Sequence, residues 1–298
     1  MSDITLLDGS VGQEIVKRSG DRATYLWSTS VMIEKPGIVR DVHADYFRVG
    51  ATVATTNTYA MHRDRLRKVD LEDQFGSLVE AALVEAEGAQ RAAGGGRIAA
   101  SLGPLGASYR PDICPPVAEA APLYAELAGL MADRVDLFLI ETVSSLMHAD
   151  GALTGCSGID KPVWLAVSVD DDDGTKLRSG EPVSDLASIV ERHAPDAVLI
   201  NCSRPEVVGE ALDIVKGFGR PFGAYANGFT RISEGFKADN PTVDALEQRT
   251  DLGPEAYAAF AMGWVAQGAT IVGGCCEVGP DHITELAGQL RAAGHRIV

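Results

Sequence analysis

The sequence predicts an α/β protein with the (β/α)8 architecture of a TIM barrel. Eight short, nearly continuous apolar runs are rich in β-branched residues, which is typical of parallel strands buried on both faces. Segments with apolar residues at helical spacing lie between most of these runs, and this alternation indicates a parallel sheet with right-handed crossovers. A doubly wound sheet is the competing architecture. It is disfavoured because no glycine-rich GxGxxG turn follows the first run.

The predicted elements alternate along the whole chain. We place the strands at residues 4–8, 51–56, 97–102, 137–141, 163–169, 197–202, 222–226 and 270–274. Residues 36–49 fill the first crossover, and further helices are predicted at 71–93, 119–134, 145–154, 183–192, 206–216, 254–267 and 281–293. Helix starts are marked by residues that suit a first turn or cap: Pro205, Pro254, Ser145, Ser184 and Asp281. With no linker or internal repeat, we expect residues 1–298 to form a single domain.

The amino-acid composition limits the kinds of molecule that the protein is expected to bind. Hydrophobic residues make up 46% and charged residues 23% of the chain, as in ordinary globular proteins. The formal net charge of −16 argues against nucleic acid and anionic membranes, since both attract basic surfaces. We expect no signal peptide and no membrane span, and therefore a cytoplasmic protein whose cysteines are thiols, metal ligands or catalytic groups. The sequence does not decide between a monomer and a homo-oligomer.

Polar and thiol side chains end most of the predicted strands. The C-terminal strand ends carry the active site in a TIM barrel. The residues at these ends include Asp8 and Gly9, Asn57 and Tyr59, Glu141, Asn201 and Cys202, Asn227, and Cys275 and Cys276. Two long loops, 170–182 and 228–253, are expected to shape the substrate site. The acidic run at 170–174 lacks the spacing of a calcium loop, so we interpret it as solvated.

Three cysteines are predicted to share one rim of the barrel. Cys202 ends the sixth strand, and Cys275 and Cys276 end the eighth. Three protein ligands with one open position are typical of catalytic zinc, and thiolates select zinc over magnesium or calcium. We attribute Gly273 and Gly274 to clearance where the thiols converge. Burial in the core and a vicinal disulfide or redox switch remain alternative interpretations of these cysteines.

Several segments spread over nearly the whole chain form a distinctive set. They are LLDGSVGQE (6–14), LWS (26–28) with the segment 36–60, SLGPLG (101–106), LIETVSS (139–145), INCS (200–203) and IVGGCCEVGPDHI (271–283). With these segments the chain resembles the homocysteine S-methyltransferase family. These zinc-dependent TIM barrels include betaine- and S-methylmethionine-dependent enzymes and the N-terminal module of cobalamin-dependent methionine synthases.

The resemblance implies a role for each site residue. Cys202, Cys275 and Cys276 match the three zinc ligands. Asp8 and Gly9 match residues that hold the amino-acid end of homocysteine, Glu141 matches the carboxylate that pairs with its ammonium group, and Asn227 matches a residue that lines the site. Tyr59 lies where betaine-type members have a tyrosine that can occupy the open zinc position. Trp27 matches a tryptophan that faces the methyl donor in those members.

The family pattern also implies the reaction: methyl transfer from a sulfonium or ammonium donor to homocysteine, giving methionine. Betaine-type members carry an aromatic residue directly after the Glu141 position, where this chain has Thr142, and Glu277 also departs from other members. We therefore favour S-methylmethionine or S-adenosylmethionine as donor, and expect Glu277 to influence that preference. The alternatives are a non-catalytic zinc or redox-sensing binding protein on the same barrel, and methyl transfer to another thiol.

Overall fold

One parallel sheet organises the chain. The computed structural model describes residues 2–20, 26, 28–237 and 246–298. Within these residues the sheet has nine strands in the order β2-β3-β4-β5-β6-β7-β8-β1-β9. The strands are β1 (Asp3–Leu6), β2 (Val53–Thr55), β3 (Arg97–Leu102), β4 (Leu137–Val143), β5 (Val163–Val167), β6 (Ala197–Asn201), β7 (Phe222–Tyr225), β8 (Ile271–Val272) and β9 (Arg296–Ile297).

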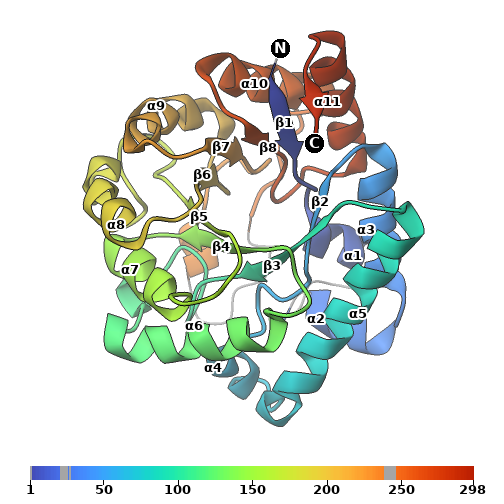
Figure 1. The fold of residues 1–298 in the computed structure, drawn as a ribbon, viewed down its shortest axis with the longest axis vertical. Helices are drawn as coiled ribbons and strands as arrows, with labels where there is room; N and C mark the ends of the chain where they lie inside the picture. The colour runs from blue at the N-terminus through green and yellow to red at the C-terminus, as the bar shows by residue number, and fades with distance from the viewer. Residues whose placement is uncertain (1, 21–25, 27, 238–245) are drawn as a thin grey trace.

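The sheet curls until its first two strands meet. Leu7, just past β1, forms a parallel bridge with Val53 of β2. The Thr52 amide donates to the Leu6 carbonyl at 2.7 Å, and the Asp8 amide donates to the Val53 carbonyl at 3.1 Å. Figure 1 shows the strands as a central ring inside a circle of helices. The predicted TIM-barrel class is therefore confirmed.

The helices cover the outside of the ring. They are α1 (Val11–Ser19), α2 (Ser28–Glu34), α3 (Ile38–Val49), α4 (Arg63–Arg67), α5 (Phe75–Ala93), α6 (Val117–Met131), α7 (Leu146–Gly155), α8 (Leu186–His193), α9 (Pro205–Val215), α10 (Pro254–Gln267) and α11 (Pro280–Ala292). Pro205 and Pro254 begin their helices, and the Ser145 hydroxyl accepts the His148 amide hydrogen, as the cap prediction required. The short helices α1, α2 and α4 were not predicted.

Strand alternation divides the interior into two cores. The larger core lies between sheet and helices. The smaller core fills the barrel, and Leu137 and Leu139 belong to it. Because side chains alternate along a strand, Glu141 points the same way as these two leucines, one step nearer the C-terminal end. Apolar layers therefore fill the barrel, and a polar layer covers them at the rim.

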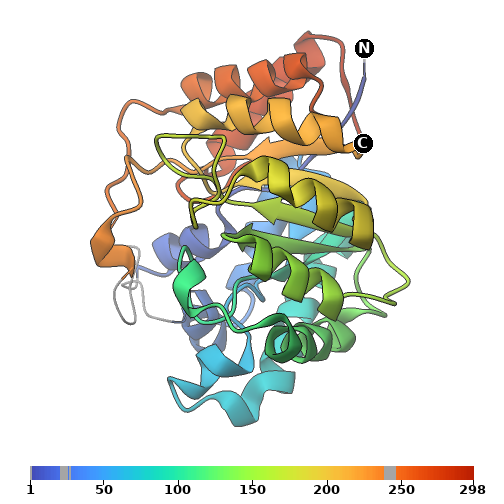
Figure 2. The ribbon, with the colours of Figure 1, turned by 90° about the vertical axis from the view of Figure 1, so that its left-hand side faces the viewer.

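The two ends of the barrel differ. β9 pairs in parallel with the start of β1, joining Asp3 to Arg296 and Ile4 to Ile297, so the chain ends meet at one end of the barrel. Figure 2 shows the termini at that end and the extended stretches 228–237 and 246–253, in orange, at the other. The site described below lies at this second end, beyond the carboxyl ends of the strands.

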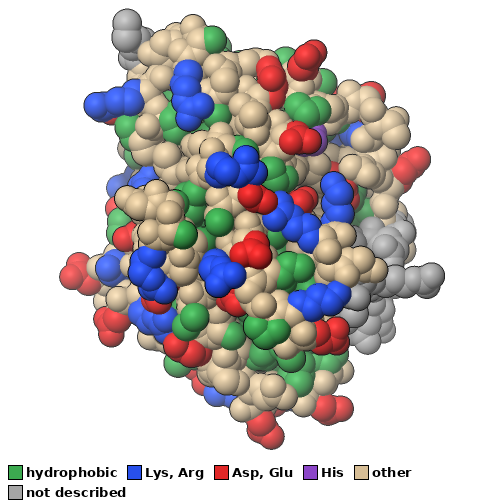
Figure 3. Space-filling model, turned by 90° about the vertical axis from the view of Figure 1, so that its right-hand side faces the viewer, with side chains coloured by type: hydrophobic (Ala, Val, Ile, Leu, Met, Phe, Trp, Pro, Cys, Tyr) green, Lys and Arg blue, Asp and Glu red, His purple; other side chains and the backbone are tan. Residues whose placement is uncertain are grey.

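Surface charges are interspersed. On the face in Figure 3, Lys and Arg side chains lie among Asp and Glu side chains. Across the described surface, acidic and basic side chains also form ion pairs, such as Arg18 with Asp45 at 2.7 Å. The acidic side chains behind the net charge of −16 therefore do not gather into one patch on this face. Among the described helices, none combines the length and apolar composition that a membrane crossing requires.

Candidate metal and substrate site

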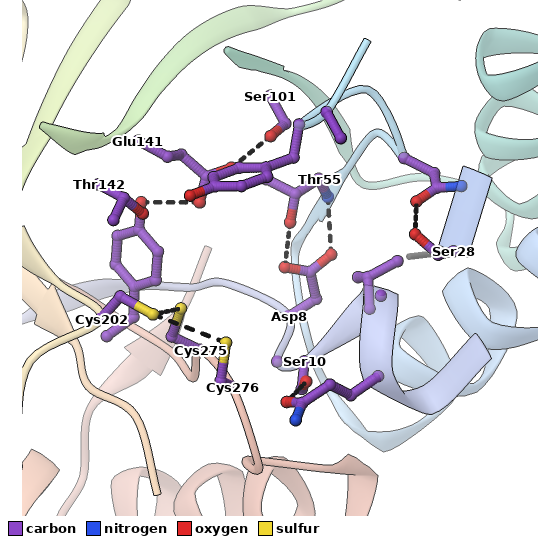
Figure 4. A pocket seen from close by; sticks show the side chains of 18 of the residues that line it. Asp8, Ser10, Ser28, Thr55, Ser101, Glu141, Thr142, Cys202, Cys275 and Cys276 are labelled. Carbon is purple, nitrogen blue, oxygen red and sulfur yellow. Dashed lines mark hydrogen bonds between the residues drawn. The ribbon is translucent and has the colours of Figure 1, made fainter. Parts of the chain in front are cut away.

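Three thiols converge at the rim beside β7. The Cys202 amide donates to the Tyr225 carbonyl at 3.1 Å, and the Cys275 amide donates to the Ala226 carbonyl at 2.9 Å. Because consecutive residues of one segment anchor both cysteines, the ends of β6 and β8 are held at the same height. The Sγ atoms of Cys202, Cys275 and Cys276 all lie within 4.8 Å of one another (Figure 4).

The thiol arrangement suits a soft metal ion. Thiolates around tetrahedral zinc, with Zn–S bonds of about 2.3 Å, lie about 3.8 Å apart. The Sγ atoms of Cys202 and Cys276 are 3.7 Å apart, while those of Cys202 and Cys275 are 2.6 Å apart. A small outward rotation of Cys275 therefore completes the trigonal base of such a site. The three residues form the only cluster of His, Cys, Asp or Glu with metal-ligand spacing in the described part of the chain.

Cys202 is the most acidic of the three thiols. Burial opposes its ionisation, but hydrogen bonds from Cys275, Cys276 and Tyr109 hold the pKa of Cys202 well below its ordinary value. Sharing that hydrogen-bond network raises the pKa of Cys275 and Cys276, with burial acting in the same direction. The site therefore favours at least one thiolate before a metal binds.

Tyr109 contacts the thiol cluster directly. It follows β3, and its hydroxyl donates to Cys202 Sγ at 3.0 Å. Its ring belongs to an apolar cluster that packs against Cys275 and Cys276 and includes Phe229, Ile232, Phe236 and Leu246. The cluster therefore covers one side of the thiol group. Tyr109 was not among the predicted site residues.

Glu141 lies across the cavity from the thiols. Its Oε1 accepts a hydrogen bond from the Ser101 hydroxyl of β3, and its Oε2 accepts one from the Tyr225 hydroxyl of β7 at 3.0 Å (Figure 4). Burial raises the pKa of Glu141 to about 7, although both hydrogen bonds lower it. A buried carboxylate with this pKa gains stability when a cationic group arrives beside it.

Asp8 is held at the junction of β1 and β2. Its Oδ2 accepts the Thr55 amide hydrogen at 2.7 Å, and its Oδ1 accepts a hydrogen bond from the Thr55 hydroxyl. Burial raises the pKa of Asp8 to about 8. Asp8 therefore helps to close the barrel and also presents a second carboxyl group to the cavity.

The other predicted site residues fall in different places. Gly9 and Tyr59 line the cavity. The Tyr59 hydroxyl lies 2.8 Å from Ser108 Oγ, so in this structure the tyrosine at the thiols is Tyr109. Asn227 is buried and accepts the Phe229 amide hydrogen at 3.1 Å, but it is not among the residues that line the cavity. Trp27 lies outside the described residues.

The clearance role assigned to two glycines was wrong in its detail. A Cβ on Gly273 would lie 2.5 Å from Leu7 Cβ, and one on Gly274 would lie 2.2 Å from Val278 Cγ1. Both glycines therefore allow close packing of the eighth strand against the first strand and the following turn. They position Cys275 and Cys276 through the backbone and do not clear space for the thiols themselves.

Backbone strain concentrates at this rim. Tyr109, Thr142, Cys202 and Glu277 have φ angles of 59°, 56°, 47° and 64°, in the left-handed region that non-glycine residues rarely adopt. Such residues persist where the surroundings hold them in place, and they are common at functional sites. The Asn201 amide shows one such restraint, because its Oδ1 accepts the Thr142 amide hydrogen at 3.0 Å.

Sequence reasoning missed Ser101, Tyr225 and Tyr109. The first two could have been found, because strand alternation puts Ser101 and Tyr225 on the barrel interior near the rim. Tyr109 lies in an irregular loop, and no periodic pattern indicates where its side chain points.

Glu277 is one layer away from the cavity. Its Oε1 accepts a hydrogen bond from Gln13 Nε2, and its amide donates to Gln13 Oε1 at 2.6 Å. Gln13 lines the cavity, whereas Glu277 is not among the lining residues. Gln13 therefore links Glu277 to the cavity wall.

The cavity between thiols and carboxyl groups is anionic in character. Among its described lining residues, Asp8 and Glu141 are the only carboxyl groups, and none is Lys, Arg or His. Neutral hydroxyl and amide groups, including Ser28, Asn57 and Gln13, complete one wall. The cavity is therefore suited to ligands that carry positive charge.

Fold and site together define a TIM-barrel protein with a candidate metal–thiolate centre facing buried carboxyl groups. The family model for homocysteine S-methyltransferase matches residues 5–290, and the chain belongs to that family.

Individual relatives agree with this assignment. The chain is 26% identical to homocysteine S-methyltransferase YbgG of Bacillus subtilis, over 97% of this chain and 95% of that protein. It is 28% identical to the homocysteine S-methyltransferase of Escherichia coli, over 95% of this chain and 94% of that protein. The crystal structure of metallated E. coli homocysteine methyltransferase MmuM superposes with a TM-score of 0.81 at 26% identity, covering 97% of this chain and 96% of that one.

Proposed function

We propose that this protein is a zinc-dependent enzyme that transfers a methyl group from a sulfonium donor to the thiol of homocysteine, giving methionine. The observation that carries the proposal is one cavity lined by three convergent thiols and by Glu141. Family membership supports methyl transfer to homocysteine. The zinc ion, the donor and the residue roles are our inference from the cavity.

Cys202, Cys275 and Cys276 would hold the zinc ion. When bound, zinc supplies the Lewis acidity that keeps a substrate thiol deprotonated at neutral pH, where a free thiol with a pKa near 8.5 is mostly protonated. The Tyr109 hydroxyl hydrogen-bonds Cys202 Sγ, and the apolar cluster around Tyr109 packs against Cys275 and Cys276.

Glu141 would bind the ammonium group of homocysteine. Ser101 and Tyr225 hold its two oxygens from opposite sides, so the carboxylate is oriented before substrate binds. Asp8 provides a second carboxyl group for the amino-acid end, and the Gly9 backbone lies beside it on the cavity wall. Fixing homocysteine at this end orients its sulfur toward the thiol cluster.

The anionic cavity favours a cationic methyl donor. As the homocysteine sulfur bonds to the methyl carbon, the bond from that carbon to the donor sulfonium breaks and its electron pair stays on the donor sulfur. The donor leaves as a neutral thioether, so no side chain needs to supply a proton. Orientation of sulfur and methyl in line supplies most of the acceleration in such transfers.

The position after Glu141 separates the donor classes. Thr142 replaces an aromatic side chain that would help enclose a quaternary ammonium. We therefore favour S-methylmethionine or S-adenosylmethionine over betaine. Small hydroxyl and amide groups on the wall, such as Ser28 and Asn57, suit a donor with its own polar groups.

The test combines metal analysis with a donor panel. Purified protein should contain about one zinc ion per chain and form methionine from homocysteine with S-methylmethionine or S-adenosylmethionine, more slowly with betaine or dimethylsulfoniopropionate. Zinc binding or reversible thiol oxidation with no methionine from any donor would instead identify a binding or redox-sensing protein. Faster turnover of a thiol that lacks the amino-acid group would identify a different acceptor.

A further inference from the structure

The 170–182 loop contains a buried ion pair. Arg178 Nη2 lies 2.8 Å from Asp171 Oδ1, and both side chains are only 6% exposed. This corrects the interpretation of the acidic run as wholly solvated: Asp172 is 62% exposed, while Asp171 is inside the protein. Taking two charges out of water costs free energy, and this cost is offset only when further hydrogen bonds satisfy each charge.

One further atom of each side chain hydrogen-bonds to a group near the thiols. Arg178 Nε donates to Ser168 Oγ at 3.1 Å, and the Ser168 hydroxyl donates to the Cys202 carbonyl at 3.2 Å. Asp171 Oδ2 accepts the Ile232 amide hydrogen at 2.8 Å. Ile232 belongs to the apolar cluster over the sulfur atoms. The pair thus joins the 170–182 loop to the end of β6 and to the 228–253 loop.

The same guanidinium group also packs on Tyr109. Arg178 Cζ lies 5.2 Å from the centroid of the Tyr109 ring, above its face. Phe236 contacts Tyr109 edge-on, with ring centroids 5.7 Å apart. With its ring held by these two neighbours, Tyr109 directs its hydroxyl to Cys202 Sγ.

We propose that the Asp171–Arg178 pair is a positioning element of the methyl-transfer site. It holds Tyr109 against Cys202 and fixes the Ile232 segment over the thiols, so that the donor meets a rigid wall. The inference rests on the proposed function for its catalytic consequence. The structural part of the inference, that the ion pair links the two loops, does not depend on the proposed function.

The decisive variants are Arg178→Met and Arg178→Lys. The methionine removes the charge at similar length, and the lysine restores a charge without the planar group that stacks on Tyr109. The chain offers a matched control in Arg231→Met, because Arg231 pairs with Asp172 and joins the same two loops, but both side chains are more than half exposed. Only the buried pair should affect the site.

The first measurement uses metal-free protein. Hydrogen exchange in peptides spanning 228–237 should be at least about tenfold faster in Arg178→Met than in wild type, be partly restored in Arg178→Lys, and stay at the wild-type rate in Arg231→Met. Equal exchange in Arg178→Met and Arg231→Met overturns the proposal, because the buried pair would then hold the loop no better than the exposed one.

The second measurement uses zinc-loaded enzyme. Arg178→Met should lower kcat by about tenfold to a hundredfold, the range expected when reacting groups are displaced by about 1 Å, with the KM for homocysteine changed less than about twofold. Tyr109→Phe removes only the hydroxyl and should reproduce part of that loss even if Arg178→Met folds poorly. Wild-type kcat in Tyr109→Phe overturns the proposal. If wild type forms no methionine with any donor, the proposed function fails, while the exchange experiment still decides whether the pair holds the loop.

Discussion

Replacing Glu141 with glutamine should stabilise the substrate-free protein and impair the enzyme. Glutamine has nearly the same shape and can still accept one of the two hydrogen bonds from Ser101 and Tyr225. The substitution therefore removes a buried negative charge with little change in packing. Stability and homocysteine binding should respond to that loss in opposite directions.

The stability gain follows from the pKa of Glu141. Burial raises this pKa from 4.5 to about 7 in the folded state, so the unfolded chain ionises first as the pH rises. The folded state loses stability between about pH 4.5 and pH 7, and the full loss, of order 3 kcal/mol, persists above pH 7. Glu141→Gln should recover up to that amount at pH 8 and almost none at pH 4.5.

Glu141→Gln should weaken homocysteine binding because the ammonium group of homocysteine loses its charged partner. Removing one partner of a buried charged hydrogen bond costs about 2–5 kcal/mol, which corresponds to a rise of roughly thirtyfold to several-thousandfold in the KM for homocysteine. The KM for the donor should change much less, because Glu141 is assigned to the acceptor.

Urea unfolding of metal-free protein at pH 8 and pH 4.5, together with steady-state kinetics, measures both effects. Glu126→Gln is a suitable control, because Glu126 is an exposed partner of Arg63 on the outer helix α6. The reasoning is refuted if Glu141→Gln is destabilised at pH 8, or if its KM for homocysteine stays within twofold of wild type.

Three further predictions concern the metal, acid stability and barrel closure. Cys275→Ser should lose stoichiometric zinc in metal analysis and at least about a hundredfold of activity, whereas Cys156→Ser, at a residue that follows α7 and does not line the cavity, should keep its zinc. His43 is buried with no hydrogen-bond partner for either nitrogen among the described residues, and burial lowers its pKa to about 4. Protonation of this residue in the unfolded chain should therefore remove about 2 kcal/mol of stability between pH 6.5 and pH 5, and urea titrations should show His43→Leu gaining about that amount relative to wild type over this range. Gly9→Ala places a Cβ 2.1 Å from the Val278 carbonyl oxygen, and should lower the free energy of unfolding by at least about 2 kcal/mol in the same assay.

Strand and helix patterns predicted most of the architecture. The eight apolar runs all contain or overlap strands of the barrel, because a strand buried on both faces must be apolar along its length. Helices that cover the sheet, such as α5 and α10, were predicted from their apolar spacing. The unpredicted α1, α2 and α4 are short, and the two-residue β9 exists only because β1 offers it a pairing edge.

The candidate site was predicted less evenly. Cys202, Cys275 and Cys276 were brought together correctly, because parallel strands of one barrel end at one rim. The positions of the Tyr109 and Asp171 side chains were not predicted. Both residues lie in loops, where no repeating geometry relates sequence position to side-chain direction.

The sequence by itself thus determined the barrel, the end of the barrel that carries the chemistry and the three thiols that meet there, since each follows from local periodicity and from where strands stop. Only the tertiary structure decided which tyrosine contacts Cys202, that Asp171 is buried against Arg178, and that Gly273 and Gly274 serve packing of the backbone. These features arise where loops from separate strands meet, and their contacts depend on distances between residues far apart in the chain.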